Sequence, residues 1–198
     1  MGLRLPPLLE FLDADGRVEG EILPGEHVCV VVPDGRDIDA LVDALMLPAS
    51  SAPARLRHGV GGRGTGLVCH EPLLLAELGL RENLALVAGQ ARQPLQRDFD
   101  ARVAEVLSRT GLLQGVDLEA PAGTLPWVTR VEASFIQAWL KEPQWLVFDR
   151  VFSHAGAASV AHLPGLFRRA FPLRTVCYLA SACPDPALTG AYRCLRIS

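Results

Sequence analysis

The sequence predicts an α/β fold in which helices flank a mostly parallel sheet. Two apolar runs of strand length, at residues 27–32 and 145–148, do not alternate polar with apolar residues, which is typical of strands buried on both faces. Segments with apolar residues at helical spacing, such as residues 38–46, lie between runs of this kind. The 198 residues are enough for one large α/β domain or two small ones, and a hydrophobic content of 49% allows a sizeable core.

Each element can be justified in turn along the chain. Residues 8–32 are expected to form strands joined by glycine-containing turns. Residues 49–66 are small, glycine-rich and basic, so we expect a loop there. The remaining expected elements are a strand at 67–69, mostly helical chain over 80–113, irregular chain over 114–129, a helix at 130–141, a helix at 157–171, and strands at 175–180 and 192–197.

Charge and composition exclude some functions. The net charge of -3 argues against a nucleic-acid binder that relies on neutralising phosphates. The apolar runs are too short to span a bilayer, and no charged-then-apolar signal opens the chain, so we expect a cytoplasmic protein. Five cysteines are widely spaced without a CxxC pair, which favours reduced thiols, and no ligand spacing predicts a metal site.

The turn before the helix at 38–46 lies between a strand and a helix, as a phosphate-binding loop does, but it lacks most of the residues of such a loop. Working loops use glycines for close backbone approach, a Lys for the phosphates and a Ser or Thr for Mg²⁺. Here Gly35 survives, Asp37 stands at the second glycine, Ile38 at the Lys and Asp39 at the hydroxyl. Aspartates repel a phosphate, and Asp37 suits the N-cap of the helix that follows. The segment alone also fits an ordinary turn.

Five segments fall in the order of one family's motifs: 23–31, 66–75 with 80–86, 138–149, 152–156, and 174–181. They resemble, in turn, the strand entering the Walker A loop, the Q-loop with the start of the helical subdomain, the helix after the signature motif with the Walker B strand, the D-loop, and the switch strand of ABC-transporter ATP-binding subunits. The resemblance covers roughly residues 8–198.

This resemblance implies a P-loop NTPase-like ABC ATPase fold, as a single domain over 1–198 with a helical subdomain at 80–140. It implies partners as well: a membrane permease subunit, and another ABC ATPase subunit or a second copy of this chain. Binding to a permease would place the protein at the inner face of the membrane. The family's nucleotide-site positions fall on Gly35, Asp37, Asp39, His70 and Asp149.

The family's catalytic residues are replaced. Walker B keeps Asp149, but Arg150 follows it where the family has the Glu that polarises water, and an Arg has no accessible neutral form that could act as a base. His70 replaces the Q-loop Gln, and Ser181 replaces the switch His. We therefore expect weak binding of MgATP or none, no catalytic residues, and a carboxylate of Asp149 paired with Arg150 or with a loop amide.

The signature motif is also lost. Its position falls on residues 125–129, where only Leu125 matches. Thr129 and Glu132 have the spacing of a capping box, which would let the next helix satisfy its own first amides. Trp127 in this stretch is either part of a surface for another protein or packed into its own helical subdomain.

Three functions fit these observations. The first is an ABC-like subunit that does not hydrolyse ATP and acts as a scaffold or regulator in a transporter complex. The second is a weak nucleotide hydrolase or transferase with an unusual arrangement around Asp149, His70 and Ser181. The third is a stand-alone ligand-binding α/β domain.

Overall fold

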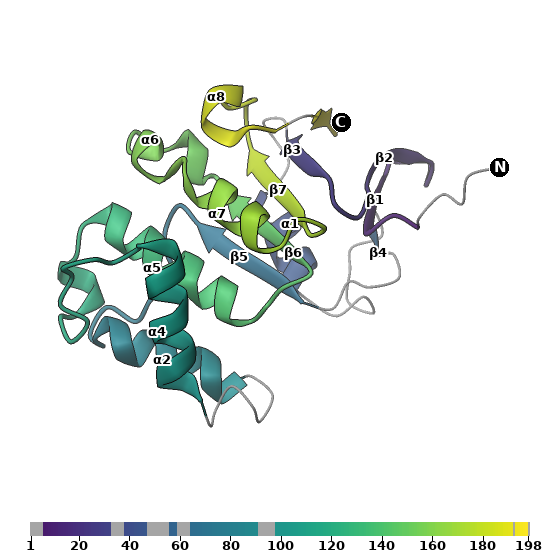
Figure 1. Cartoon of the computed structure of the whole chain (residues 1–198). Helices are drawn as coiled ribbons and strands as arrows, with labels where there is room; N and C mark the ends of the chain where they lie inside the picture. The colour runs from purple at the N-terminus through teal and green to yellow at the C-terminus, as the bar shows by residue number, and fades with distance from the viewer. Residues whose placement is uncertain are drawn as a thin grey trace.

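The computed structural model of the chain describes residues 6–32, 38–46, 56–58, 64–90, 98–191 and 193–197. From the third strand onward, strands are interspersed with helices, as the sequence predicts (Figure 1). The elements in chain order are β1 (Leu9–Leu12), β2 (Val18–Ile22), β3 (His27–Val31), α1 (Ile38–Met46), β4 (Leu56–His58), β5 (Thr65–Cys69), α2 (Leu80–Gln90), α4 (Phe99–Thr110), η2 (Ala122–Thr124), α5 (Trp127–Leu140), β6 (Trp145–Asp149), η3 (Val151–Ser153), α6 (Ala157–Val160), α7 (Leu163–Ala170), β7 (Thr175–Ala180), α8 (Pro186–Thr189) and β8 (Arg193–Arg196).

The larger sheet has five parallel strands in the order β5-β6-β7-β3-β8. This confirms the predicted fold class. Because the strands are parallel, their carboxyl ends meet at one edge of the sheet. The register pairs Cys69 with Asp149, and Asp149 with Leu179, at that edge. The residues that follow β5 and β6 are therefore neighbours.

A second, antiparallel sheet has the order β2-β1-β4. The prediction of loop throughout residues 49–66 is wrong at both β4 and the start of β5, because β1 supplies the partner for one and β6 for the other. The small sheet lies against β8, where a Cβ on Gly20 would come within 2.6 Å of a Leu195 methyl carbon. A side chain at position 20 would therefore require Leu195 to move.

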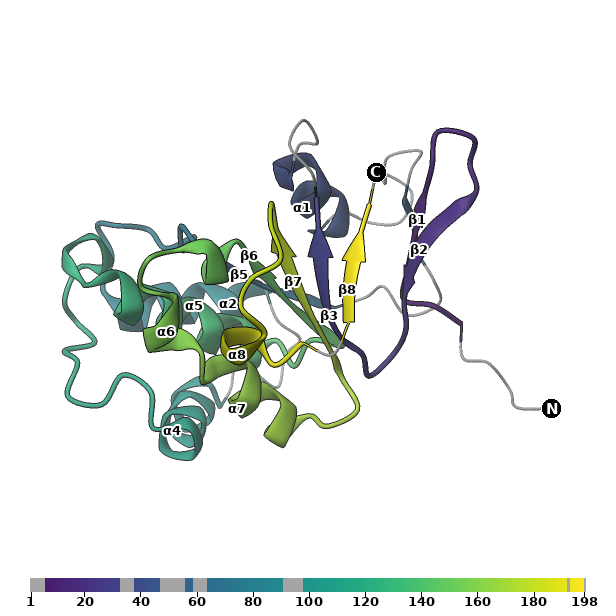
Figure 2. The same cartoon turned by 90° about the horizontal axis from the view of Figure 1, so that it is seen from above.

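Helices cover both faces of the larger sheet (Figure 2). Successive side chains of β3 point to opposite faces, so Val28 and Val30 pack with Leu41 and Leu45 of α1 and with the small sheet. The other side chains of β3 and its neighbours face a second core cluster beneath α5, α6 and α7. Both faces of the central strands are thus buried.

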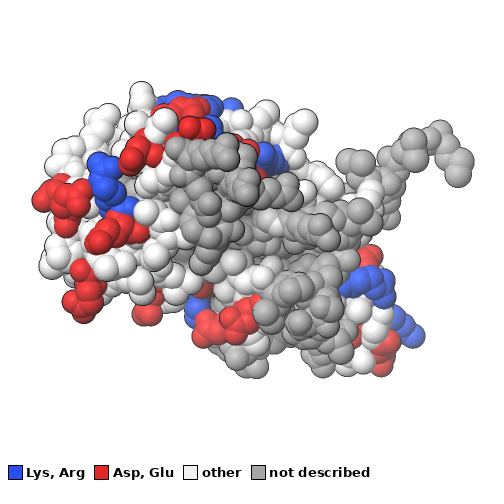
Figure 3. All heavy atoms as spheres, turned by 90° about the horizontal axis from the view of Figure 1, so that it is seen from below, with Lys and Arg blue, Asp and Glu red and all other residues white. Residues whose placement is uncertain are grey.

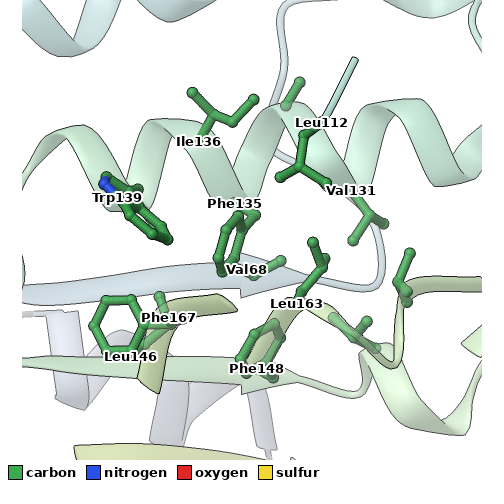
Figure 4. Close-up of a cluster of buried hydrophobic side chains, with 14 of the residues drawn as sticks. Val68, Leu112, Val131, Phe135, Ile136, Trp139, Leu146, Phe148, Leu163 and Phe167 are labelled. Atoms are coloured by element: carbon green, nitrogen blue, oxygen red, sulfur yellow. The ribbon is translucent and has the colours of Figure 1, made fainter. Parts of the chain in front are cut away.

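Helix α5 is the main cover of the second face. Its side chains Val131, Phe135 and Trp139 recur every four residues and point toward the sheet (Figure 4). Phe135 stacks on Phe148 of β6, with ring centroids 6.4 Å apart. Replacing a buried Phe of this kind by Ala costs about 3–5 kcal/mol. No helix in the described part of the chain is long and apolar enough to cross a membrane.

The predicted helix at 157–171 is divided into α6 and α7. Pro164 lies in the first turn of α7. A proline ring clashes with the carbonyl four residues before it, here that of Val160, and has no N–H to donate. The first helix therefore ends at Val160, and a new one begins at Leu163.

A buried hydrogen-bond chain links β3, α7, β7 and α8. Arg168 Nη1 donates to His27 Nδ1 at 3.2 Å, His27 Nε2 contacts the Tyr178 hydroxyl, and that hydroxyl donates to the Thr189 carbonyl at 2.8 Å. Burial, together with the positive charge of Arg168, lowers the pKa of His27 to about 4. A protonated His27 would have to turn an N–H toward the guanidinium.

We expect the protein to lose stability as the pH falls from about 6.5 toward 4. The folded-state pKa of His27 lies below the unfolded value, so its contribution is present above about pH 6.5 and is lost on acidification through the folded pKa. The loss is about 2–3 kcal/mol. Urea unfolding across this range should show a shallower pH dependence in His27→Gln. The exposed His162→Gln serves as control, and equal slopes in the two variants would contradict the assignment.

Candidate functional site

The carboxyl ends of β5 and β6 place Cys69, His70, Asp149 and Arg150 together. Asp149 is 2% exposed at the last position of β6. The His70 N–H donates to the Asp149 carbonyl at 2.9 Å, and the Arg150 N–H donates to the Leu179 carbonyl at 2.9 Å. Parallel strand pairing therefore fixes the backbone around the buried carboxylate.

Arg150 encloses the Asp149 carboxylate. Its Nε donates to Oδ1 at 2.8 Å and its Nη2 to Oδ2 at 3.1 Å. Neighbouring residues of an extended strand point to opposite faces, so a two-bond contact between them needs a departure from extended backbone. Arg150 provides it with a φ of 54°, in the left-handed region that residues with side chains rarely adopt. Of the two partners predicted for Asp149, Arg150 or a loop amide, the structure shows Arg150.

The same guanidinium reaches α1. Arg150 Nη2 also donates to Asp39, which lies in the first turn of that helix. Hydrogen bonding to Asp149 is the main cause that raises the pKa of Arg150, so the cation is fixed. Burial, and next the charge of Asp149, raise the pKa of Cys69 to about 12, which keeps that thiol protonated. One guanidinium thus joins two carboxylates from separate elements.

These contacts do not fit a Mg²⁺ ion at Asp149. Both carboxylate oxygens already accept hydrogen bonds, and a metal ion there would face a permanent positive charge on Arg150. Gly35 and Asp37, two of the five predicted nucleotide-site residues, lie outside the described residues. Asp39 is in the first turn of α1. His70 follows β5, and Ser181 is exposed after β7.

The predicted capping box at Thr129 is wrong. Helix α5 begins at Trp127, with Pro126 at the N-cap and no side-chain hydrogen bond to the cap. Thr129 is therefore inside the first turn. Glu132 instead accepts from the Leu113 N–H at 3.3 Å. A proline at the N-cap fixes φ and lets the helix begin three residues earlier than the Thr-x-x-Glu spacing indicates.

Trp127 packs within its own chain. Its indole Nε1 donates to the His70 carbonyl at 2.6 Å, and its ring stacks on His154 at 3.9 Å between centroids. Of the two alternatives for this residue, the structure favours internal packing. The partners, however, are loops after β5 and β6, outside the predicted helical subdomain. A Cβ on Gly156 would lie 2.9 Å from the indole, so glycine is needed there.

A pocket of about 470 Å³ opens beside this tryptophan. Two buried nitrogens in its lining, His70 Nδ1 and Arg130 Nε, have no hydrogen-bond partner among the described residues. Buried polar atoms without partners are costly, and a ligand or a partner's polar group could satisfy them. The lining residues are His70, Glu71, Pro72, Trp127, Arg130 and His154.

The segment after the pocket is held by a side chain that sequence reasoning missed. Asn83, fully buried, accepts from the Leu75 N–H at 2.7 Å and donates to the carbonyls of Leu75, Leu78 and Gly79 at 3.0–3.1 Å. On this pinned segment Leu73 is 76% exposed and Leu75 is 55% exposed. The sequence feature that could have indicated this role is an Asn in the first turn of a helix that follows a run of leucines.

We expect Asp149 and Arg150 to be coupled in a double-mutant cycle of Asp149→Asn and Arg150→Met. Removing one partner leaves a buried charge unpaired, and the coupling should be about 1–3 kcal/mol, reduced because the Arg150 side chain is 29% exposed. Urea unfolding at neutral pH measures it. The exposed pair Glu105 and Arg109 is the control, with about 0.5 kcal/mol or less. Equal coupling energies for the two pairs would mean that the Asp149–Arg150 pair stabilises the fold no more than an exposed ion pair does.

No protein-family model matches the chain, and a search of curated proteins found no match. Solved structures do match it. One is cbiO1 from Clostridium perfringens, part of the ABC transporter complex cbiONQ, with a TM-score of 0.65 and 17% identity over 93% of this chain and 82% of that one. Another is a metal-chelate type ABC transporter in an inward-facing conformation, with a TM-score of 0.66 and 12% identity over 90% of this chain and 74% of that one. At these identities the likeness concerns the fold, and the chain has the fold of ABC-transporter ATP-binding subunits.

Proposed function

We propose that this chain is a non-hydrolysing subunit with the ATP-binding-cassette fold, and that it acts as a scaffold or regulator in a transporter complex. The observation that carries the proposal is the Arg150 guanidinium, which contacts the carboxylates of Asp149 and Asp39 where the resemblance places the Mg²⁺ ligands. A fixed cation in that position repels a metal ion and cannot accept a proton from water.

In the family that the chain resembles, each ATP site joins the Walker A loop of one chain to the signature motif of another. The residues at both of these positions support the same conclusion. Ile38, at the position of the phosphate-binding Lys, supplies no charge for a phosphate, and Asp39 would repel one. On the other half, Pro126 has no N–H to donate at the start of α5. A pair of such chains would lack both halves, so association would depend on direct protein contact.

The contact surface we assign to a permease subunit is the segment around Leu73 and Leu75. Large exposed apolar side chains on a folded protein favour a protein partner, and Asn83 holds the backbone before binding, so little ordering entropy is lost. Among the described residues on the face in Figure 3, basic side chains lie close to acidic ones, so these residues offer little net charge to attract a polyanion. The similar solved structures are parts of ABC transporters, which supports a membrane subunit as the partner.

We expect no saturable binding of MgATP in a calorimetric titration at moderate salt. The reason is the absence of a Lys at position 38, together with the ion pairs of Arg150. An intact cassette subunit titrated in the same buffer is the positive control. Micromolar affinity for MgATP would overturn the non-hydrolysing role.

We expect Leu73→Asp with Leu75→Asp to abolish capture of a co-expressed permease subunit, because each carboxylate would have to be desolvated in an apolar contact. Thermal unfolding of the variant should stay near wild type, since both side chains are exposed. The matched control is Leu173→Asp, whose side chain is 86% exposed in the turn between α7 and β7. Undiminished capture by the double variant would place the contact elsewhere.

A further inference from the structure

Three cysteines that are far apart in sequence converge at one point. The sulfur atoms of Cys29, Cys183 and Cys194 all lie within 4.8 Å of one another. Cys29 lies on β3, Cys194 lies beside it on β8 in the register of the sheet, and Cys183 lies in the segment between β7 and α8. Parallel pairing and the crossover through α8 create a cluster that no sequence spacing indicates.

The cluster has the dimensions of a metal site. Two thiolate sulfurs bound to one zinc ion at about 2.3 Å lie roughly 3.8 Å apart in tetrahedral geometry, so the three sulfurs need to close by no more than about 1 Å. A disulfide would join only two of them and leave the third as a neighbouring thiol. Three sulfurs around one point match a single ion better than they match a disulfide.

The surroundings of the cluster allow an ion to enter and to stay. Cys29 is buried, whereas Cys183 and Cys194 are exposed, so the ion would bind against an apolar floor and meet solvent on the other side. Thiolates are the ligands that soft ions such as zinc and copper(I) prefer.

We propose that Cys29, Cys183 and Cys194 bind one zinc ion as three thiolates, with the fourth position open to water or to an external ligand. Each thiol that binds releases its proton to solvent, and no electron is transferred. Among the described residues, strand β8 pairs with the larger sheet on one side, through β3. The ion would tie β8 and the segment before α8 to β3, and would therefore stabilise the end of the chain.

The experiment is a Co²⁺ titration of the reduced full-length protein, with Co²⁺ as a spectroscopic stand-in for zinc, followed by zinc competition. We expect a thiolate-to-cobalt charge-transfer band that saturates at one ion per chain and disappears on adding zinc. Zinc should also raise the thermal midpoint. Cys183→Ser and Cys194→Ser should each weaken binding more than about tenfold. Both side chains are exposed, so these variants should fold, which circular dichroism can check.

The matched control is Cys69→Ser, a change of the same kind at a buried cysteine outside the cluster, which should leave Co²⁺ binding unchanged. The proposal is overturned if no charge-transfer band develops in the reduced protein. It is equally overturned if the band persists in the Cys183→Ser Cys194→Ser double variant, which would indicate adventitious metal at other ligands. Formation of a Cys183–Cys194 disulfide with no metal uptake by the reduced protein would assign the cluster to redox chemistry instead.

Discussion

Complete burial of the three adjacent strands β6, β7 and β3 is the constraint on which the rest of this fold depends. Every residue of these strands is buried. Each large apolar side chain removed from water contributes about 1.5–3 kcal/mol, so both faces must be covered. Helix α1 and the small antiparallel sheet cover one face, and the helices α5 to α7 cover the other. Parallel pairing of the same strands gathers the charged side chains at a single edge.

The strongly patterned elements were predictable from sequence. β7 was predicted with its observed bounds, and the other buried strands to within two residues at either end, because continuous apolar runs of β-branched and aromatic residues have few alternatives. The antiparallel strand β4 was missed because its three residues depend on β1, more than forty positions earlier. The start of α5 was misplaced because a capping box at Thr129 competed with a proline N-cap at Pro126. Local pattern was a poor guide where distant pairing or backbone restriction decided the outcome.

The candidate site also has features that could be predicted from sequence and features that could not. That Arg150 stands where the resemblance places a catalytic carboxylate could be inferred from the sequence, and the ion pair with Asp149 followed from charge and proximity. That Arg150 also reaches Asp39 could not be inferred, because the two residues are more than a hundred positions apart. The convergence of three thiols was invisible for the same reason. Fold class and local charge can be predicted from short segments of sequence. The contacts between side chains of different elements depend on how the whole sheet is assembled.

The indole of Trp127 joins three segments that are far apart in the sequence. It connects the first residue of α5 to the carbonyl of His70 and to the ring of His154, two loops that leave neighbouring strands. Breaking the hydrogen bond and the stacking contact would cost about 1–3 kcal/mol, several times the thermal energy. These two contacts join the start of α5 to the segments that follow β5 and β6, so the helical layer is attached to the edge of the sheet at this point.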